Sequence, residues 1–341
     1  VFNKYTSASG ATLKREKTKI LRIGNMKLRR PPNRLRGFLV EKLAVYGAVI
    51  SPEGFDKDAN LASFRETVEN FSGKTAPLYT SIFGKINIFN TYVLSKLWYI
   101  GPFMDLSIAE YRKIEKCLET FINKPWTKNA IPLAIMKSAK EKGGAGFPDV
   151  RAKIDCFRLM IHIRRLRASE PLMWHELYDS YFAEVEQIRS QRQLRNAEVP
   201  CLVKWVKSAM IKWDVRFENP GIFHLQGSQQ NLRTASVSLL YRHLCKGFET
   251  AQKPRVYWQN FYPNINWIAT WTNVKTKFSD GFSRNIHFLM LHIGLNTNYR
   301  LSRYQAISPG CVSCRLIRKV DVVETEYHAF ADCVVASTLY D

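Results

Sequence analysis

The chain has 341 residues, of which 46% are apolar, 13% aromatic and 23% charged. This composition is globular and excludes intrinsic disorder and low-complexity or fibrous classes. Its 51 Lys and Arg residues outnumber 29 Asp and Glu residues, and the resulting formal charge of +22 excludes an acidic-surface protein. So large a positive charge indicates a polyanionic partner. At a rough prior of about 150 residues per domain, the length predicts more than one domain.

The positive charge is concentrated near the N-terminus. Residues 1–50 hold twelve Lys and Arg residues against Glu16 and Glu41, a net charge of +10, whereas residues 301–341 have a net charge of −1. The basic run 27–36 can neutralise several phosphates at once, which gives salt-dependent, sequence-independent affinity for nucleic acid. A solvated loop or a localisation signal is the alternative interpretation of this run.

Neither a signal peptide nor a membrane span is predicted. Residues 1–19 are polar and basic, and the longest apolar stretch, 82–104, is interrupted by two Lys and two Asn residues. Seven cysteines at irregular spacing fit a reducing compartment better than a disulfide framework. We therefore expect an intracellular protein, in the nucleus or the cytoplasm, without a membrane partner.

The first predicted elements are strands, and helices follow. Alternation over 18–23 predicts a short strand, and the residues around Gly47 predict a β-rich run within 38–50 that a turn at 51–54 closes. Apolar residues at helical spacing then predict helices over 56–73, 77–97 and 106–121. The last of these places five apolar residues on one face: Ile108, Tyr111, Ile114, Leu118 and Phe121.

The strongest break in the helical pattern is Gly143-Gly144-Ala145-Gly146-Phe147-Pro148. A further helix through 157–163 follows it, and residues 170–250 are predicted to be helices separated by short breaks. Six aromatic residues lie between 257 and 271. A packed core is the favoured interpretation of these aromatics, with base stacking as the alternative.

Four potential metal ligands lie close together in the pattern Cys311-x2-Cys314-x13-His328-x4-Cys333. Three thiolates and one imidazole are the ligand set of a tetrahedral structural zinc site, and four protein ligands leave no open position for catalysis. Unpaired core cysteines are the alternative. The remaining cysteines stand singly on helical patterns and are expected to be small buried hydrophobes: Cys117, Cys156, Cys201 and Cys245.

Motifs for self-contained catalysis are missing from the sequence. It has no G-x-x-x-x-G-K-[ST], G-x-S-x-G or H-E-x-x-H motif and no adjacent Asp-Asp pair. A hydrolase centre or a two-metal polymerase centre within the chain is therefore not expected. The sequence predicts binding rather than catalysis.

Taken in order, these segments resemble the C-terminal half of the reverse transcriptase of non-LTR (LINE-type) retrotransposons. Residues 2–10 and 17–21 resemble the palm segment that follows the catalytic Asp-Asp motif, and Leu43-Ala44-Val45-Tyr46-Gly47-Ala48-Val49-Ile50 resembles the hairpin that grips the primer terminus. Residues 90–121 are similar to the thumb, and Gly143 to Asp149 match the G-G-x-G-x-P-D signature. Residues 254–271, 288–301 and the Cys/His cluster resemble the zinc-binding module that ends many such polymerases.

This resemblance implies a predominantly α-helical α+β fold with four parts. They are the end of the palm with its hairpin (1–53), a helical thumb (54–145), a helical connector (146–225) and an aromatic-rich CCHC zinc-binding module (226–341). The implied function is to hold template RNA and DNA primer during target-primed reverse transcription. The implied partner is the upstream half of the polymerase, which would carry the catalytic aspartates and magnesium. This part alone is expected to be inactive, with zinc as a structural ion.

The resemblance also implies individual roles. Lys17 would approach the incoming nucleotide, with an ordinary surface lysine as the alternative. Contacts to nucleic acid are expected from Lys14, Lys17, Arg29, Arg30, Arg34, Arg36, Tyr46 and Gly47. Two other functions are carried as alternatives: a stand-alone, domesticated nucleic-acid-binding protein, and a helical protein-interaction scaffold whose binding would be insensitive to salt.

Overall fold

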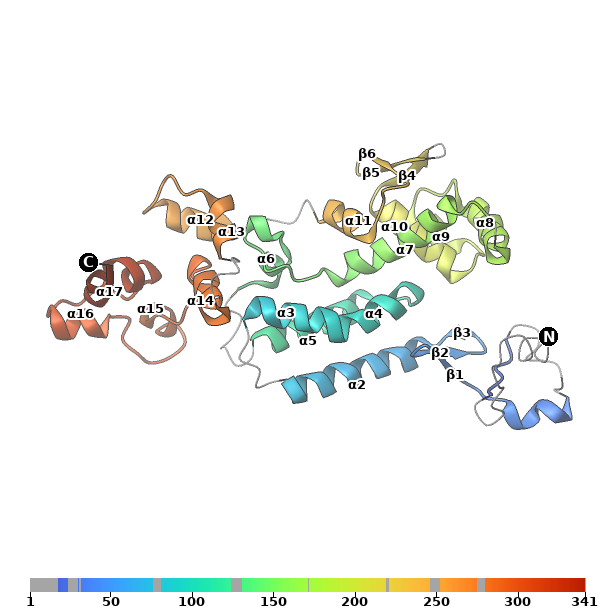
Figure 1. Cartoon of the computed structure of the whole chain (residues 1–341), viewed down its shortest axis with the longest axis horizontal. Coiled ribbons are helices and arrows are strands. Elements are labelled where there is room, and N and C mark those ends of the chain that lie inside the picture. The colour runs from blue at the N-terminus through green and yellow to red at the C-terminus, as the bar shows by residue number, and fades with distance from the viewer. Residues whose placement is uncertain are drawn as a thin grey trace.

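A computed structural model of the chain describes residues 18–23, 30, 32–75, 81–123, 131–170, 172–218, 221–245, 252–274 and 280–340. Within these ranges the fold is α+β and predominantly helical, with two three-stranded antiparallel sheets, which confirms the predicted fold class. The molecule is elongated: strands β1–β3 lie toward one end, and helices α15, α16 and α17 lie at the other (Figure 1).

The first sheet is a hairpin with a third short strand. It follows a 3-10 helix, and the elements are η3 (Asn33–Phe38), β1 (Leu43–Val45), β2 (Ala48–Ser51) and β3 (Gly54–Phe55). Val45 pairs with Ala48, so Tyr46 and Gly47 form a two-residue turn with φ angles of 50° and 83°. Positive φ at both central residues is the type I′ geometry, whose twist suits a hairpin.

The strand predicted over 18–23 is much shorter in the structure. Among these residues only Ile20 forms a β-bridge, to Leu39. The partner segment is extended for only a few residues between η3 and β1, so it offers no longer ladder to pair with.

A helical layer follows the first sheet. Its elements are α2 (Lys57–Thr75), α3 (Ile82–Phe89), the π-helical turn η4 (Asn90–Leu94), α4 (Ser95–Ile100), η5 (Gly101–Phe103) and α5 (Ile108–Asn123). The helix predicted over 77–97 begins at Ile82, where Ser81 caps it by accepting a hydrogen bond from the Gly84 N–H, and η4 carries it on to Ile100. Ile108 does not join the buried face of α5 as expected: it starts that helix and is 57% exposed.

Two short helices come next, α6 (Leu133–Lys137) and η6 (Lys140–Lys142), and they pack with the first helical layer and α13. A second helical unit with its own sheet follows. Its elements are α7 (Val150–Arg167), α8 (Met173–Val185), α9 (Gln191–Asn196), α10 (Cys201–Lys212), β4 (Val215–Glu218), β5 (Ile222–Leu225), β6 (Ser228–Asn231) and α11 (Val237–Leu244). The prediction of helices alone over 170–250 is wrong, because β4, β5 and β6 form an antiparallel meander. Val-Arg-Phe-Glu and Ile-Phe-His-Leu alternate in burial along β4 and β5, a period of two that marks strands. The predicted boundary at 225/226 falls in the turn between β5 and β6.

Short helices make up the C-terminal part. They are α12 (Gln252–Gln259), α13 (Trp267–Asn273), α14 (Gly281–Leu291), α15 (Asn298–Leu301), α16 (Val312–Ile317), the π-helical turn η7 (His328–Asp332) and α17 (Val334–Tyr340). No helix of the described residues is both long and apolar enough to span a bilayer.

Three hydrophobic clusters hold the described residues together. The largest joins the α2–α5 layer to α12–α14 and contains Trp258, Trp267 and Trp271, which confirms the packed-core interpretation for these three tryptophans. Phe261 and Tyr262 are exposed, so the interpretation is wrong for them. Helix α7 links it to the second cluster, because Ile154 belongs to the first and Leu159 to the second. The third contains the cysteines near the C-terminus. Of the four single cysteines, Cys156 is buried as expected, Cys245 is half-buried, and Cys117 and Cys201 are exposed.

His162 in the second cluster predicts a pH dependence of stability. It is 5% exposed, stacks on Phe182 with ring centroids 4.3 Å apart, and has Nδ1 3.1 Å from the Tyr178 hydroxyl. Burial lowers its pKa from 6.5 to about 4, so between these pH values the unfolded chain binds more protons than the folded chain. The stabilisation is full above pH 6.5 and is lost as the pH falls through this window.

When the pH is lowered from 7 to about 4.5, the free energy of unfolding in urea should therefore fall about 2 kcal/mol more for the wild-type chain than for the His162→Gln variant. Equal losses in the two proteins would contradict the role assigned to His162.

Candidate metal centre and nucleic-acid interface

The four predicted metal ligands meet in one buried cluster. Cys311 precedes α16, Cys314 lies in its first turn, His328 begins η7, and Cys333 separates η7 from α17. Their ligand atoms all lie within 4.8 Å of one another. The Sγ atoms of Cys311 and Cys333 are 3.7 Å apart, and Cys314 Sγ is 3.4 Å from His328 Nε2.

These separations suit a tetrahedral ion. Zn–S bonds of about 2.3 Å and Zn–N bonds of about 2.0 Å place tetrahedral S···S pairs about 3.8 Å and S···N pairs about 3.5 Å apart. The observed pairs are within a few tenths of an ångström of both values. The cluster can therefore hold a metal ion, and the interpretation of these cysteines as unrelated core residues does not account for their convergence.

The backbone around the cluster explains how a local sequence builds it. An antiparallel bridge pairs Gly310 with Val323, and the Cys311 N–H donates to the Val322 carbonyl at 2.7 Å. The Cys314 carbonyl accepts from the N–H groups of Arg318 and Val320, which closes the turn after α16. These bonds return the chain toward the second pair of ligands.

A carboxylate lies next to the imidazole of the cluster. His328 presents Nε2 to Cys314, and its Nδ1 lies 3.5 Å from Asp332 Oδ2, so a carboxylate stands behind the ring as it does in many metal sites. Burial raises the pKa of the Cys311 thiol. Burial also tends to raise the pKa of the Cys333 thiol. Hydrogen bonds from the Val335 N–H and from Cys311 outweigh burial and lower this pKa.

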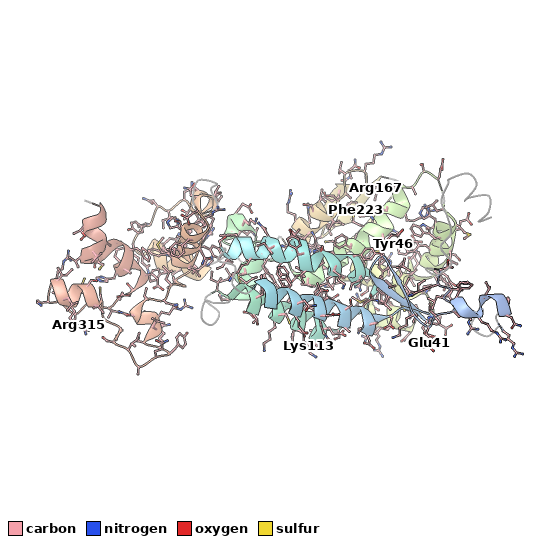
Figure 2. The ribbon with its side chains drawn as sticks, turned by 60° about the horizontal axis from the view of Figure 1, so that its bottom comes forward. Glu41, Tyr46, Lys113, Arg167, Phe223 and Arg315 are labelled. Carbon is pink, nitrogen blue, oxygen red and sulfur yellow. The ribbon has the colours of Figure 1, made fainter. Side chains whose placement is uncertain are left out.

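The predicted primer-grip residues sit on the first sheet, at the other end of the molecule. Tyr46 is 91% exposed at the tip of the hairpin, next to Gly47. Figure 2 shows Tyr46 far along the molecule from Arg315, which lies in α16 beside the metal cluster. The metal cluster and the hairpin are therefore separate sites.

Asn60, which sequence reasoning missed, fixes the hairpin to α2. Its side chain accepts from the Val49 N–H at 2.9 Å and donates to the Val49 carbonyl at 2.8 Å, so the amide pairs with β2 as a neighbouring strand would. It also donates to the Asp56 carbonyl, and Lys42 forms a 2.8 Å ion pair with Asp56. Asn60 is 1% exposed, and no spacing rule singles out a polar residue one turn into a helix.

Only part of the predicted basic surface can be placed. Arg30 and Arg36 are exposed, and neither has a carboxylate partner among the residues that the structure describes. Arg34 and Arg36 both lie in η3, which precedes the hairpin. Lys14, Lys17 and Arg29 lie outside the described residues. The exposed arginines and Tyr46 belong to the same N-terminal part of the fold.

Comparison with known proteins finds a similarity to a transposon protein. No family model matches the chain. Over 196 residues, 56% of this chain, it is 27% identical to the "Transposon TX1 uncharacterized 149 kDa protein" of Xenopus laevis. The matched region is 15% of that protein, so this chain spans a small part of its length. The similarity supports an origin in a transposable element.

Proposed function

We propose that this chain is the C-terminal part of an RNA-directed DNA polymerase of a non-LTR retrotransposon. Its role would be to hold template RNA and DNA primer against a catalytic centre carried by an upstream half of the polymerase. The similarity to a transposon protein supports the origin, and the order of the segments along the sequence supports the assignment to a reverse transcriptase. On this proposal the catalytic aspartates and magnesium belong to that upstream half, and this part alone does not extend a primer.

The observation that carries the proposal is the chemistry of the N-terminal part. A hairpin with an exposed aromatic tip follows a segment whose exposed arginines, Arg30 and Arg36, lack carboxylate partners within the described ranges. Unneutralised guanidinium groups suit phosphates, and a tight turn with Gly47 at φ 83° lets backbone approach a primer end closely. Lys17 would lie near the incoming nucleotide in this arrangement.

The Cys/His cluster is assigned to structural zinc. Four protein ligands complete a tetrahedron and leave no coordination site for substrate. Residues 301–341 carry a net charge of −1 and so contribute nothing to the positive surplus. We therefore assign the cluster to holding the C-terminal part together.

Charge reversal at the arginines tests the proposed interface. Arg30→Glu/Arg36→Glu should weaken binding of an RNA–DNA duplex at least about tenfold, because each reversal removes one phosphate contact and adds a repulsion. Arg318→Glu/Lys319→Glu makes the same change of net charge at the opposite end of the molecule and should change the Kd by less than about threefold. Fluorescence anisotropy with a labelled duplex measures both. Equal losses in the two variants would mean that net charge alone attracts the duplex and would contradict the interface.

A further inference from the structure

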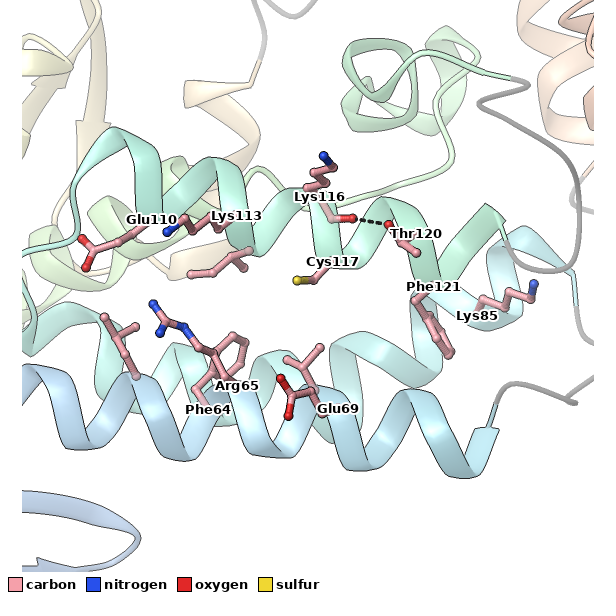
Figure 3. A pocket seen from close by; sticks show the side chains of 13 residues that line it. Phe64, Arg65, Glu69, Lys85, Glu110, Lys113, Lys116, Cys117, Thr120 and Phe121 are labelled. Carbon is pink, nitrogen blue, oxygen red and sulfur yellow. Dashed lines mark hydrogen bonds between the residues drawn. The ribbon is translucent and has the colours of Figure 1, made fainter.

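A groove of about 530 Å³ separates α2 from α5. Contacts close it at both ends: Lys57 Nζ lies 3.1 Å from Glu110 Oε2 at the N-terminal ends of the helices, and the rings of Phe71 and Phe121 are 5.3 Å apart near their C-terminal ends. The two helices therefore run in the same direction and stay apart between these contacts (Figure 3). From Lys57 to Phe71, at 1.5 Å per residue, the opening is about 20 Å long.

The floor of this groove is apolar, and its rim is cationic. The floor is formed by core side chains of both helices: Leu61, Phe64, Val68, Ile114 and Phe121. Arg65 on α2 and Lys113 and Lys116 on α5 are exposed, and none has a carboxylate partner among the described residues. Figure 3 shows Arg65 and Lys113 on opposite sides of the groove.

The acidic side chains at the groove do not balance these cations. The Glu110 carboxylate forms an ion pair with Lys57 and accepts a 2.6 Å hydrogen bond from the Ser107 N–H. Glu69 is the other carboxylate that lines the groove. Three unpaired cations against one such carboxylate give the rim a net positive charge, which complements an acidic ligand.

We propose that the groove between α2 and α5 docks an acidic amphipathic helix of a partner protein. Apolar side chains at i, i+3, i+4 and i+7 of a helix span about 10 Å, which equals the rise of α2 from Leu61 to Val68. Such a helix would place its apolar residues on the floor and its Asp or Glu residues against Arg65, Lys113 and Lys116. A nucleic-acid duplex offers phosphates for the rim but no apolar side chains for the floor.

The probes are three fluorescein-labelled helical peptides of about 14 residues, with Glu on the flanks. The first carries Leu at the four apolar positions, the second Phe and the third Trp. Each of these ordered peptides is compared with a scrambled peptide of the same composition. We expect at least one of the three ordered peptides to bind the full chain at least about tenfold more tightly than its scrambled form. Arg65→Glu/Lys113→Glu should weaken binding about tenfold, whereas Arg112→Glu, an exposed α5 residue that does not line the groove, should change it less than twofold.

Cys117 gives a second measurement inside the groove. It is exposed and lines the groove on α5, whereas exposed Cys201 starts α10 and does not line it. A pulse of N-ethylmaleimide with mass-spectrometric mapping should show the bound peptide slowing alkylation of Cys117 and leaving Cys201 unchanged. Ordered peptides that bind no better than scrambled ones, or protection of Cys117 by an RNA–DNA duplex and by none of the peptides, would overturn the proposal. Failure of the peptides to bind would leave the charge-reversal test at Arg30 and Arg36 unaffected.

Discussion

Removal of the metal from the Cys311 cluster should unfold residues 298–340 while the rest of the protein stays folded. The third hydrophobic cluster has four buried members, Cys311, Cys314, Cys333 and Ala336, so three of the four are themselves proposed metal ligands. Without the ion this part of the chain buries too little apolar surface to offset its conformational entropy. Structural zinc sites in small modules contribute about 10–16 kcal/mol of apparent binding free energy, more than the local packing can replace.

Native mass spectrometry before and after a chelator should show loss of one zinc ion, and hydrogen–deuterium exchange should then show loss of protection over 298–340. Cys311→Ser should behave like the chelated protein. Cys201→Ser, which changes an exposed cysteine away from the cluster, should behave like the wild type. Protection that persists after confirmed loss of zinc, or a chain that carries no zinc from the start, would contradict a structural metal site.

Gly144→Ala should destabilise the protein by more than about 4 kcal/mol. A Cβ added at Gly144 would lie 1.7 Å from the Ser138 carbonyl oxygen and 2.3 Å from its carbon, and backbone atoms at this distance cannot give way as a flexible side chain can. The substitution would displace the loop 143–149, which joins distant parts of the fold. His292 Nε2 lies 2.8 Å from the Gly143 carbonyl oxygen, and the Asp149 N–H donates to the Tyr241 hydroxyl at 2.7 Å.

Chemical denaturation of Gly144→Ala against the wild type measures this effect. Gly37→Ala is the matched control, because a Cβ at Gly37 meets nothing within 4 Å, and it should stay within about 1 kcal/mol of the wild type. A Gly144→Ala protein as stable as the control would show that the loop does not need the close approach to Ser138.

Features set by local sequence could be predicted. The Cys/His cluster follows from spacing, because two short turns suffice to bring Cys311 and Cys314 to His328 and Cys333. The hairpin follows from β-rich residues around Tyr46-Gly47, where Gly accepts the positive φ that the turn requires. The breaker run at 143–148 is also visible, although the sequence does not say that Gly144 is needed for its approach to Ser138.

Features that depend on residues far away in the sequence could not be predicted. His292 bonds the Gly143 carbonyl across 149 positions, and no local pattern relates the two residues. The tryptophans of 258–271 pack into the α2–α5 layer, so the largest core crosses the parts expected from the sequence. The β4–β6 sheet is not predicted because Asn219-Pro220-Gly221 indicates a break between helices, whereas β4 and β5 lie on either side of it. Asn60 and the α2–α5 groove depend on how whole helices lie beside their neighbours.

The salt dependence of duplex binding tests the central claim most directly, because phosphate contacts release counterions and contacts to a protein surface do not. The Kd of the full chain for a labelled RNA–DNA duplex would be measured by anisotropy from about 50 to about 200 mM KCl. With about six phosphates contacted, we expect affinity to fall about a thousandfold across this range. A chain that binds no duplex, or whose Kd does not change with salt, would contradict a nucleic-acid-holding function and favour a protein-interaction scaffold.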